Sequence, residues 1–119
     1  MAISLHFNYQ SGDLLDAVKN AGNNSEIGEV YMQECNLYVT PNWIYLLENL
    51  NHLNVAKNNL KFIDDLCILV NLDTLDASDN QIETLNERFF ELRKLKSLNL
   101  SGNKIRILSD GEFKFFFVS

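Results

Sequence analysis

The side chains that could carry acid–base, metal or nucleophilic chemistry in this chain are few and widely spaced. The two histidines, His6 and His52, lie far apart, and His52 has no cysteine or carboxylate beside it at the spacing of a metal site. The two cysteines, Cys35 and Cys67, are also separated, and Ser101-Gly102-Asn103 lacks the spacing of a phosphate-binding loop. The sequence therefore predicts no catalytic centre, no metal site and no cofactor.

The elements that position the polar residues follow a pattern that occurs four times. Each copy has apolar residues at its first, fourth, sixth and eleventh positions and Asn or Cys at its ninth: Ile27-x-x-Val30-x-Met32-x-x-Cys35-x-Leu37, Leu50-x-x-Leu53-x-Val55-x-x-Asn58-x-Leu60, Leu72-x-x-Leu75-x-Ala77-x-x-Asn80-x-Ile82 and Leu95-x-x-Leu98-x-Leu100-x-x-Asn103-x-Ile105. The ninth positions are 23, 22 and 23 residues apart. The central alternation predicts a short strand with alternate side chains in the core. The Asn amide that follows can satisfy backbone groups that the turn leaves buried.

A second spacing recurs between these strands. Apolar residues follow one another at intervals of three in the triplets Ile44, Leu47, Leu50, then Leu66, Leu69, Leu72, and then Phe89, Leu92, Leu95. This interval predicts a 3₁₀ turn or a short helix that shows one face to the core.

A period of this length with this signature resembles the leucine-rich repeat family. The resemblance covers residues 27–108 and implies an α/β fold, a right-handed curved solenoid with parallel strands on its concave face. The 22-residue copy is similar to the subclass typified by the protein phosphatase-1 regulatory subunit, and the 23-residue copy that follows is closer to the typical subclass. Cys35 stands where the other copies have Asn, a substitution that the family's consensus allows.

We expect one domain in three parts. Residues 1–26 form an N-terminal cap, in which a polar start at Ser11-Gly12-Asp13, apolar residues at helical spacing and Gly22 predict a short capping helix. Residues 27–108 form four repeats, and residues 109–119 form an incomplete repeat or an apolar tail. The large apolar residues between Phe113 and Val118 predict a lid, a longer array, or self-association or partner binding through the C-terminal end.

Composition and charge indicate the compartment. The net charge of −6 disfavours nucleic acid as a partner, and Arg93-Lys94-x-Lys96 is interpreted as a solvated stretch of the convex side. The first ten residues lack the features of a signal peptide, and no run approaches the length of a membrane span. The family's secreted members carry clustered cysteines, whereas Cys35 and Cys67 are predicted to be buried thiols. An intracellular protein, cytoplasmic or nuclear, without a membrane partner is expected.

The resemblance implies a noncatalytic protein-interaction or scaffolding module that binds another protein through the concave face. The outward strand positions give the candidate protein-binding residues Glu29, Tyr31, Gln33, His52, Asn54, Lys57, Thr74, Asp76, Ser78, Asp79 and Asn99. Tyr31 is the expected anchor, because tyrosine is enriched among the residues that dominate binding energy. Each of these side chains could instead be an ordinary solvated strand residue.

Two other functions stay open. The chain could be a structural subunit of a large assembly, such as a ciliary or nuclear complex, held by its edges and ends. It could also be a regulatory subunit of a phosphatase, an alternative that rests on the subclass resemblance alone.

Overall fold

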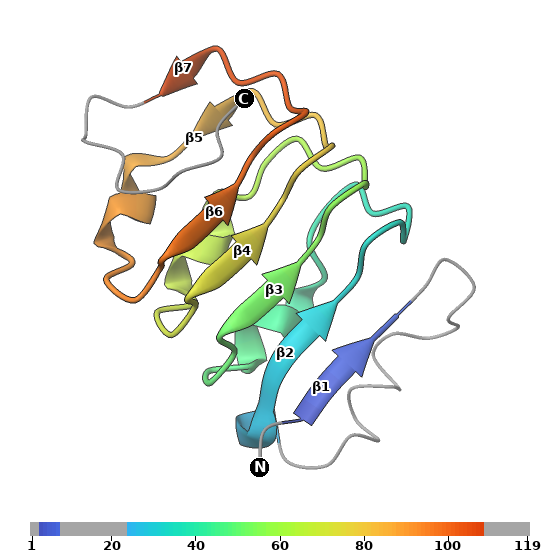
Figure 1. Ribbon diagram of the computed structural model, residues 1–119, viewed down its shortest axis with the longest axis vertical. Coiled ribbons are helices and arrows are strands. Elements are labelled where there is room, and N and C mark those ends of the chain that lie inside the picture. The colour runs from blue at the N-terminus through green and yellow to red at the C-terminus, as the bar shows by residue number, and fades with distance from the viewer. Residues whose placement is uncertain (1–2, 8–23, 109–119) are drawn as a thin grey trace.

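The computed structural model describes residues 3–7 and 24–108, and its main feature is a parallel sheet with one strand per repeat (Figure 1). The strand order is β1-β2-β3-β4-β6. The strands are β1 (Ile3–His6), β2 (Ile27–Tyr31), β3 (His52–Asn54), β4 (Thr74–Asp76) and β6 (Ser97–Asn99). The predicted strand of each copy is confirmed, because the central apolar residues Val30, Leu53, Leu75 and Leu98 are completely buried.

The first strand of the sheet was not predicted. β1 pairs in parallel with β2, and Leu5 lies opposite Val30. Phe7, which follows β1, is buried, and its ring lies 5.7 Å from that of Trp43. The N-terminal segment therefore extends the sheet and adds to the core, whereas the expected capping helix falls outside the described residues.

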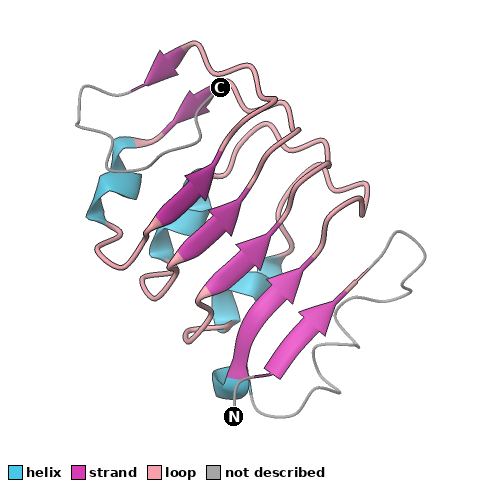
Figure 2. Ribbon diagram, viewed as in Figure 1, coloured by secondary structure: helices cyan, strands magenta, loops and turns pink. Residues whose placement is uncertain are grey.

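Short 3₁₀ helices return the chain behind the sheet (Figure 2). They are η1 (Asn24–Glu26), η2 (Asn42–Leu46), η3 (Asp64–Ile68) and η4 (Glu87–Glu91). In the second triplet, Leu69 donates its N–H to Leu66 and Leu72 donates to Leu69, and all members of the three triplets are buried. The predicted return spacing is confirmed. None of the described residues forms an α-helix, so for this part of the chain the α/β assignment is wrong.

A second, small sheet lies beyond the asparagine positions of the last repeats. Strand β5 (Thr84–Leu85) pairs in parallel with β7 (Ile107–Leu108). Neither strand was predicted, because two residues are too few to produce an alternating pattern.

The asparagine ladder joins neighbouring repeats. The Asn58 Oδ1 atom accepts the N–H groups of Cys35 and Leu37 at 3.0 Å each. Its Nδ2 atom donates back to the preceding repeat, to the carbonyl of Met32 at 3.0 Å, and within its own repeat to that of Val55 at 2.9 Å. Asn80 and Asn103 make corresponding bonds one and two repeats later. The predicted ladder is thereby confirmed.

The two cysteines differ in their surroundings. Both are free thiols, and Cys67 is buried as predicted, but Cys35 is only half-buried and its Sγ atom lies 3.5 Å from the carbonyl of Gln33. Burial raises the pKa of both thiols above the ordinary value. Because the thiolate is the reactive form, this environment lowers the reactivity of both residues.

Candidate functional site

The outer face of the sheet, called here the sheet face, carries the strand side chains that alternate with the buried ones. Its first column runs Ser4, Glu29, His52, Thr74, Ser97, and its second runs His6, Tyr31, Asn54, Asp76, Asn99. The predicted alignment of the four repeats is therefore correct. β1 adds one residue to each column.

Three rings form a row at the N-terminal half of the sheet face, called here the aromatic row. The ring of His6 stacks on that of Tyr31, with centroids 4.5 Å apart and planes 8° apart. The ring of His52 lies 5.0 Å from the other side of Tyr31 at a tilt of 40°. His6 was not among the predicted residues, and the alternation of Ile3, Leu5 and Phe7 was the signal that could have placed it.

Polar neighbours fix this row. The Tyr31 hydroxyl donates to the Glu29 carboxylate at 3.3 Å, and the Ser4 Oγ atom lies 3.0 Å from His6 Nε2. Partial burial raises the pKa of Tyr31, and the negative charge and hydrogen bond of Glu29 raise it further. The phenol therefore stays neutral at physiological pH and presents a large, oriented, amphipathic surface of the kind that protein interfaces favour.

A shallow depression of about 250 Å³ continues the sheet face toward the later repeats. Five of the predicted residues line it: His52, Asn54, Thr74, Asp76 and Asn99. Leu75 and Ser97 complete the lining. The depression and the aromatic row share His52. Together they make one continuous surface, aromatic at one end and polar at the other.

The later members of the second column also have a structural role. Asn54, Asp76 and Asn99 each accept, through Oδ1, the backbone N–H two residues ahead at 3.0 Å. Asp76 also accepts the hydroxyl of Ser78 at 2.7 Å. Ser78 was predicted as an outward residue, but it is only 7 % exposed, because its hydroxyl is held by Asp76 at the end of the strand.

We expect Asp76→Ala to lower the free energy of unfolding by about 1–2 kcal/mol, because the change removes the acceptor of two hydrogen bonds at a strand end. Asp76→Asn should stay within about 0.5 kcal/mol of the unmodified protein, since Asn99 holds Ser101 in the same way one repeat later. Urea unfolding measures both. If the two variants unfold at the same urea concentration, the side-chain oxygen has no structural role.

The remaining predicted residues lie beyond the strand ends. Gln33, Lys57 and Asp79 are exposed, and the Lys57 ammonium lies 3.7 Å from the carboxylate of Glu34, an exposed residue that was not among the candidates. Both partners are exposed, so this ion pair adds little stability. Glu34, Lys57 and Asp79 have φ between 55° and 58°, and Gly102 takes the same left-handed position in the last repeat at 72°.

The geometry offers binding contacts rather than reactive groups. Among residues 3–7 and 24–108, no three His, Cys, Asp or Glu side chains form a cluster that could hold a metal ion. The two histidines lie on opposite sides of Tyr31. Within the same ranges no helix is long and apolar enough to cross a membrane.

Large apolar side chains that were not predicted from the sequence are exposed elsewhere. Outside the sheet face, the exposed ones are Tyr38, Val39, Leu46, Phe62, Ile68 and Val70. Tyr38, Val39 and Phe62 line a groove of about 310 Å³ together with Tyr45 and polar residues. Val39 and Phe62 each follow a ladder position by four residues, and this shared position was the signal that could have found the groove.

Comparison with known proteins identifies the same repeat. A family model described as leucine rich repeat matches residues 70–116. Leucine-rich repeat-containing protein 23 of Bos taurus is 44 % identical over 59 residues, which cover 50 % of this chain and 17 % of that relative. The Homo sapiens protein of the same name is 43 % identical over 56 residues, covering 47 % of this chain and 16 % of its own length. The match thus spans about a sixth of the length of these curated relatives.

None of these matches indicates an enzyme family, and a leucine-rich repeat suggests a role in protein–protein interaction. The matched family, the in-phase apolar pattern and the parallel sheet with its asparagine ladder agree with one another. The chain is therefore similar to leucine-rich repeat proteins, and residues 70–116 match the model of that family.

Proposed function

We propose that this chain is a noncatalytic interaction module that binds one protein partner through the sheet face, the face that the family resemblance implies to be concave. The observation that carries the proposal is the aromatic row, in which Tyr31 lies between His6 and His52 on an accessible strand surface. Tyrosine in such a position combines a large contact area with a polar tip, and both histidines extend that area.

The neighbouring depression supplies the polar part of the same interface. Thr74, Ser97 and Asn99 line it and can exchange hydrogen bonds with a partner backbone or side chain. An aromatic centre beside polar groups matches the composition of specific protein interfaces, where a few aromatic residues carry most of the binding energy.

A second candidate is a structural subunit held in an assembly by its edges. The observation that favours it is the set of exposed apolar side chains away from the sheet face, because monomeric proteins seldom leave large apolar groups clustered without a use. In that case Tyr38, Val39 and Phe62, rather than Tyr31, would contact the neighbouring subunit.

Affinity capture with matched variants separates the two candidates. The full chain, the variant Tyr31→Ala with His52→Ala, and the variant Val39→Ser with Phe62→Ser are each used as bait, and the captured proteins are identified by mass spectrometry. The sheet-face proposal expects one dominant partner that only the first variant loses. Capture of a whole complex, lost only with the second variant, would support the structural-subunit candidate instead.

A further inference from the structure

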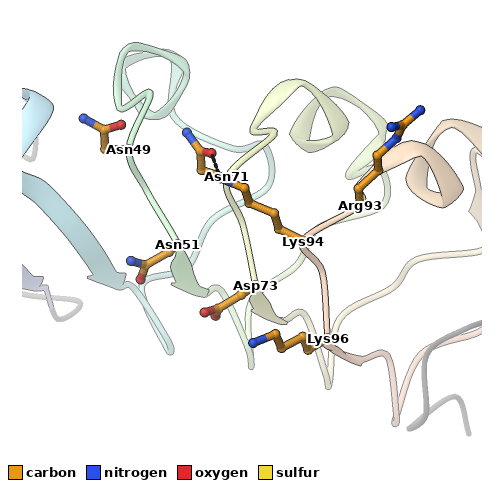
Figure 3. Close-up of a pocket in the computed structure, with 7 residues that line it drawn as sticks. All are labelled: Asn49, Asn51, Asn71, Asp73, Arg93, Lys94 and Lys96. Carbon is orange, nitrogen blue, oxygen red and sulfur yellow. Dashed lines mark hydrogen bonds between the residues drawn. The ribbon is translucent and has the colours of Figure 1, made fainter.

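A second depression, of about 590 Å³, lies where the chain runs into three neighbouring strands (Figure 3). It is called here the basic pocket and is lined by Asn49, Asn51, Asn71, Asp73, Arg93, Lys94 and Lys96. These residues come from corresponding positions just before β3, β4 and β6. The pocket therefore belongs to the edge of the sheet at the strand N-termini, opposite the edge that carries the asparagine ladder, and it is separate from the sheet face.

The charge of the basic pocket is opposite to that of the chain. The lining contains the three cations Arg93, Lys94 and Lys96 and one carboxylate, Asp73, so it carries a formal charge of +2 in a chain whose net charge is −6. From the sequence alone these basic residues are interpreted as a solvated part of the convex side. The structure instead gathers them with three side-chain amides at the sheet edge, where they give a local positive potential that attracts anions.

Side-chain hydrogen bonds run across the pocket from repeat to repeat. Asn49 donates to the carbonyl of Ser25 at 2.8 Å, and Asn71 donates to that of Glu48 at 2.7 Å. In the next repeat the Lys94 ammonium donates to Asn71 Oδ1 at 2.8 Å (Figure 3). Lys94 thus occupies the position that Asn49 and Asn71 hold in the two preceding repeats. An ammonium group has three N–H donors, so Lys94 can hold Asn71 and an oxyanion at the same time.

The cations differ in their direction. Figure 3 shows Lys96 extending toward Asp73, while the Arg93 guanidinium points away from both. Lys94 extends toward Asn71 and Lys96 toward Asp73, so these are the two cations that reach across the lining, whereas Arg93 contributes charge at the rim. Asp73 opposes an anion, since its carboxylate lies in the same lining and its Oδ1 atom already accepts the Thr74 hydroxyl at 2.8 Å.

We propose that the basic pocket binds an oxyanion on a side chain of an acidic peptide segment, with Lys94 and Lys96 as its cationic contacts. The oxyanion is either a carboxylate or a phosphate monoester, which make the same charge-assisted hydrogen bonds to ammonium groups. A peptide fits better than a nucleic acid, because a run of phosphates would extend from this confined positive area over an otherwise acidic chain. This site is additional to the sheet face and does not depend on the function proposed for it.

Fluorescence anisotropy at low ionic strength tests the proposal with the full chain and two labelled peptides. One is a glutamate-rich peptide, and the other is the same peptide with one central glutamate replaced by phosphoserine. Lys94→Gln with Lys96→Gln should weaken binding of the preferred peptide by about tenfold or more. Glutamine can still donate to Asn71, so the fold should be kept, and the thermal midpoint checks this. The stronger of the two peptides identifies the source of the oxyanion.

Two further variants make the result specific to the pocket. Lys61→Gln with Lys104→Gln removes the same charge from exposed positions outside the pocket and should change binding by no more than about twofold. Asp73→Asn should tighten binding by roughly threefold, because it removes the opposing charge.

Equal losses in the two double-lysine variants would reduce the effect to net charge and overturn the proposal. Unchanged or weaker binding by Asp73→Asn would also overturn it, as would tighter binding of an RNA oligonucleotide than of either peptide.

Discussion

Replacing Asn80 by alanine is expected to lower the free energy of unfolding by about 1–3 kcal/mol, because Asn80 is one of the buried amides that join neighbouring repeats. Asn80 is 5 % exposed, and its Oδ1 atom accepts the N–H of Leu60 at 3.0 Å. Its Nδ2 atom donates to the carbonyls of Val55, Ala77 and Ser78 at 3.0–3.1 Å. Alanine would leave the Leu60 N–H without its acceptor in the interior, where an unsatisfied group is costly. It would also remove one of the two donors from each of the three carbonyls, which keep Asn58, Asn103 and the Lys57 N–H as partners.

The matched control is the neighbouring residue. Asp79 is exposed and has φ of 55°, a conformation that asparagine tolerates and alanine does not, so Asp79→Asn is the suitable substitution. It should change the free energy of unfolding by no more than about 0.5 kcal/mol. Urea denaturation followed by circular dichroism compares the two variants. Equal midpoints would mean that the inward amide does not hold the repeats together.

Phe89→Ala is expected to lower the free energy of unfolding by about 3–5 kcal/mol. Phe89 belongs to η4 and is completely buried, so the smaller side chain would leave a cavity in addition to losing apolar burial. The same substitution at Phe62, whose side chain is 68 % exposed in the groove beside Val39, removes no core contact. Phe62→Ala should therefore stay within about 0.5 kcal/mol of the unmodified protein.

Thermal and urea unfolding of these two variants measure how far the core extends on the 3₁₀ side. A loss of stability at Phe62 as large as that at Phe89 would show that the groove is part of the core. It would then be unavailable to a neighbouring subunit, and the second candidate function would lose its main support.

The repeated part of the fold could be predicted because local spacing determines both direction and register. Alternation at Val30 and Met32 places Glu29 and Tyr31 outside, and copies of nearly equal length bring His52 beside Glu29 when parallel strands stack. The buried amides follow from the same periodicity, because in every repeat the turn after the strand leaves backbone groups that need a hydrogen-bond partner.

The first strand could not be predicted in this way. Leu5 and Phe7 alternate as the inner residues of a repeat do, but Gln10 stands where the other copies have Asn or Cys. A five-residue alternation without that residue is too short to indicate a repeat. His6 therefore joined the site only through the pairing of β1 with Tyr31 and its neighbours in β2.

The hydrogen bonds of the side chains on the sheet face could not be predicted from the sequence either. Asp76 was predicted to point outward, and it does, but its carboxylate holds the backbone and hydroxyl of Ser78. Local bonds of this type depend on the turn geometry, which periodicity does not specify. For the same reason Asp76 is a poor choice for a binding test. The ring and hydroxyl of Tyr31 instead contact His6, His52 and Glu29, which are side chains of the same face.

The dissociation constant of a purified partner for Tyr31→Ala tests the central claim most directly. Tyr31 lies at the centre of the aromatic row, so its truncation should weaken binding by about 30-fold or more while the thermal midpoint stays nearly unchanged. Val39→Ser with Phe62→Ser, measured by the same titration calorimetry, should leave the dissociation constant within about threefold. Unchanged binding by Tyr31→Ala together with a large loss in the Val39 and Phe62 variant would contradict the sheet face as the binding surface.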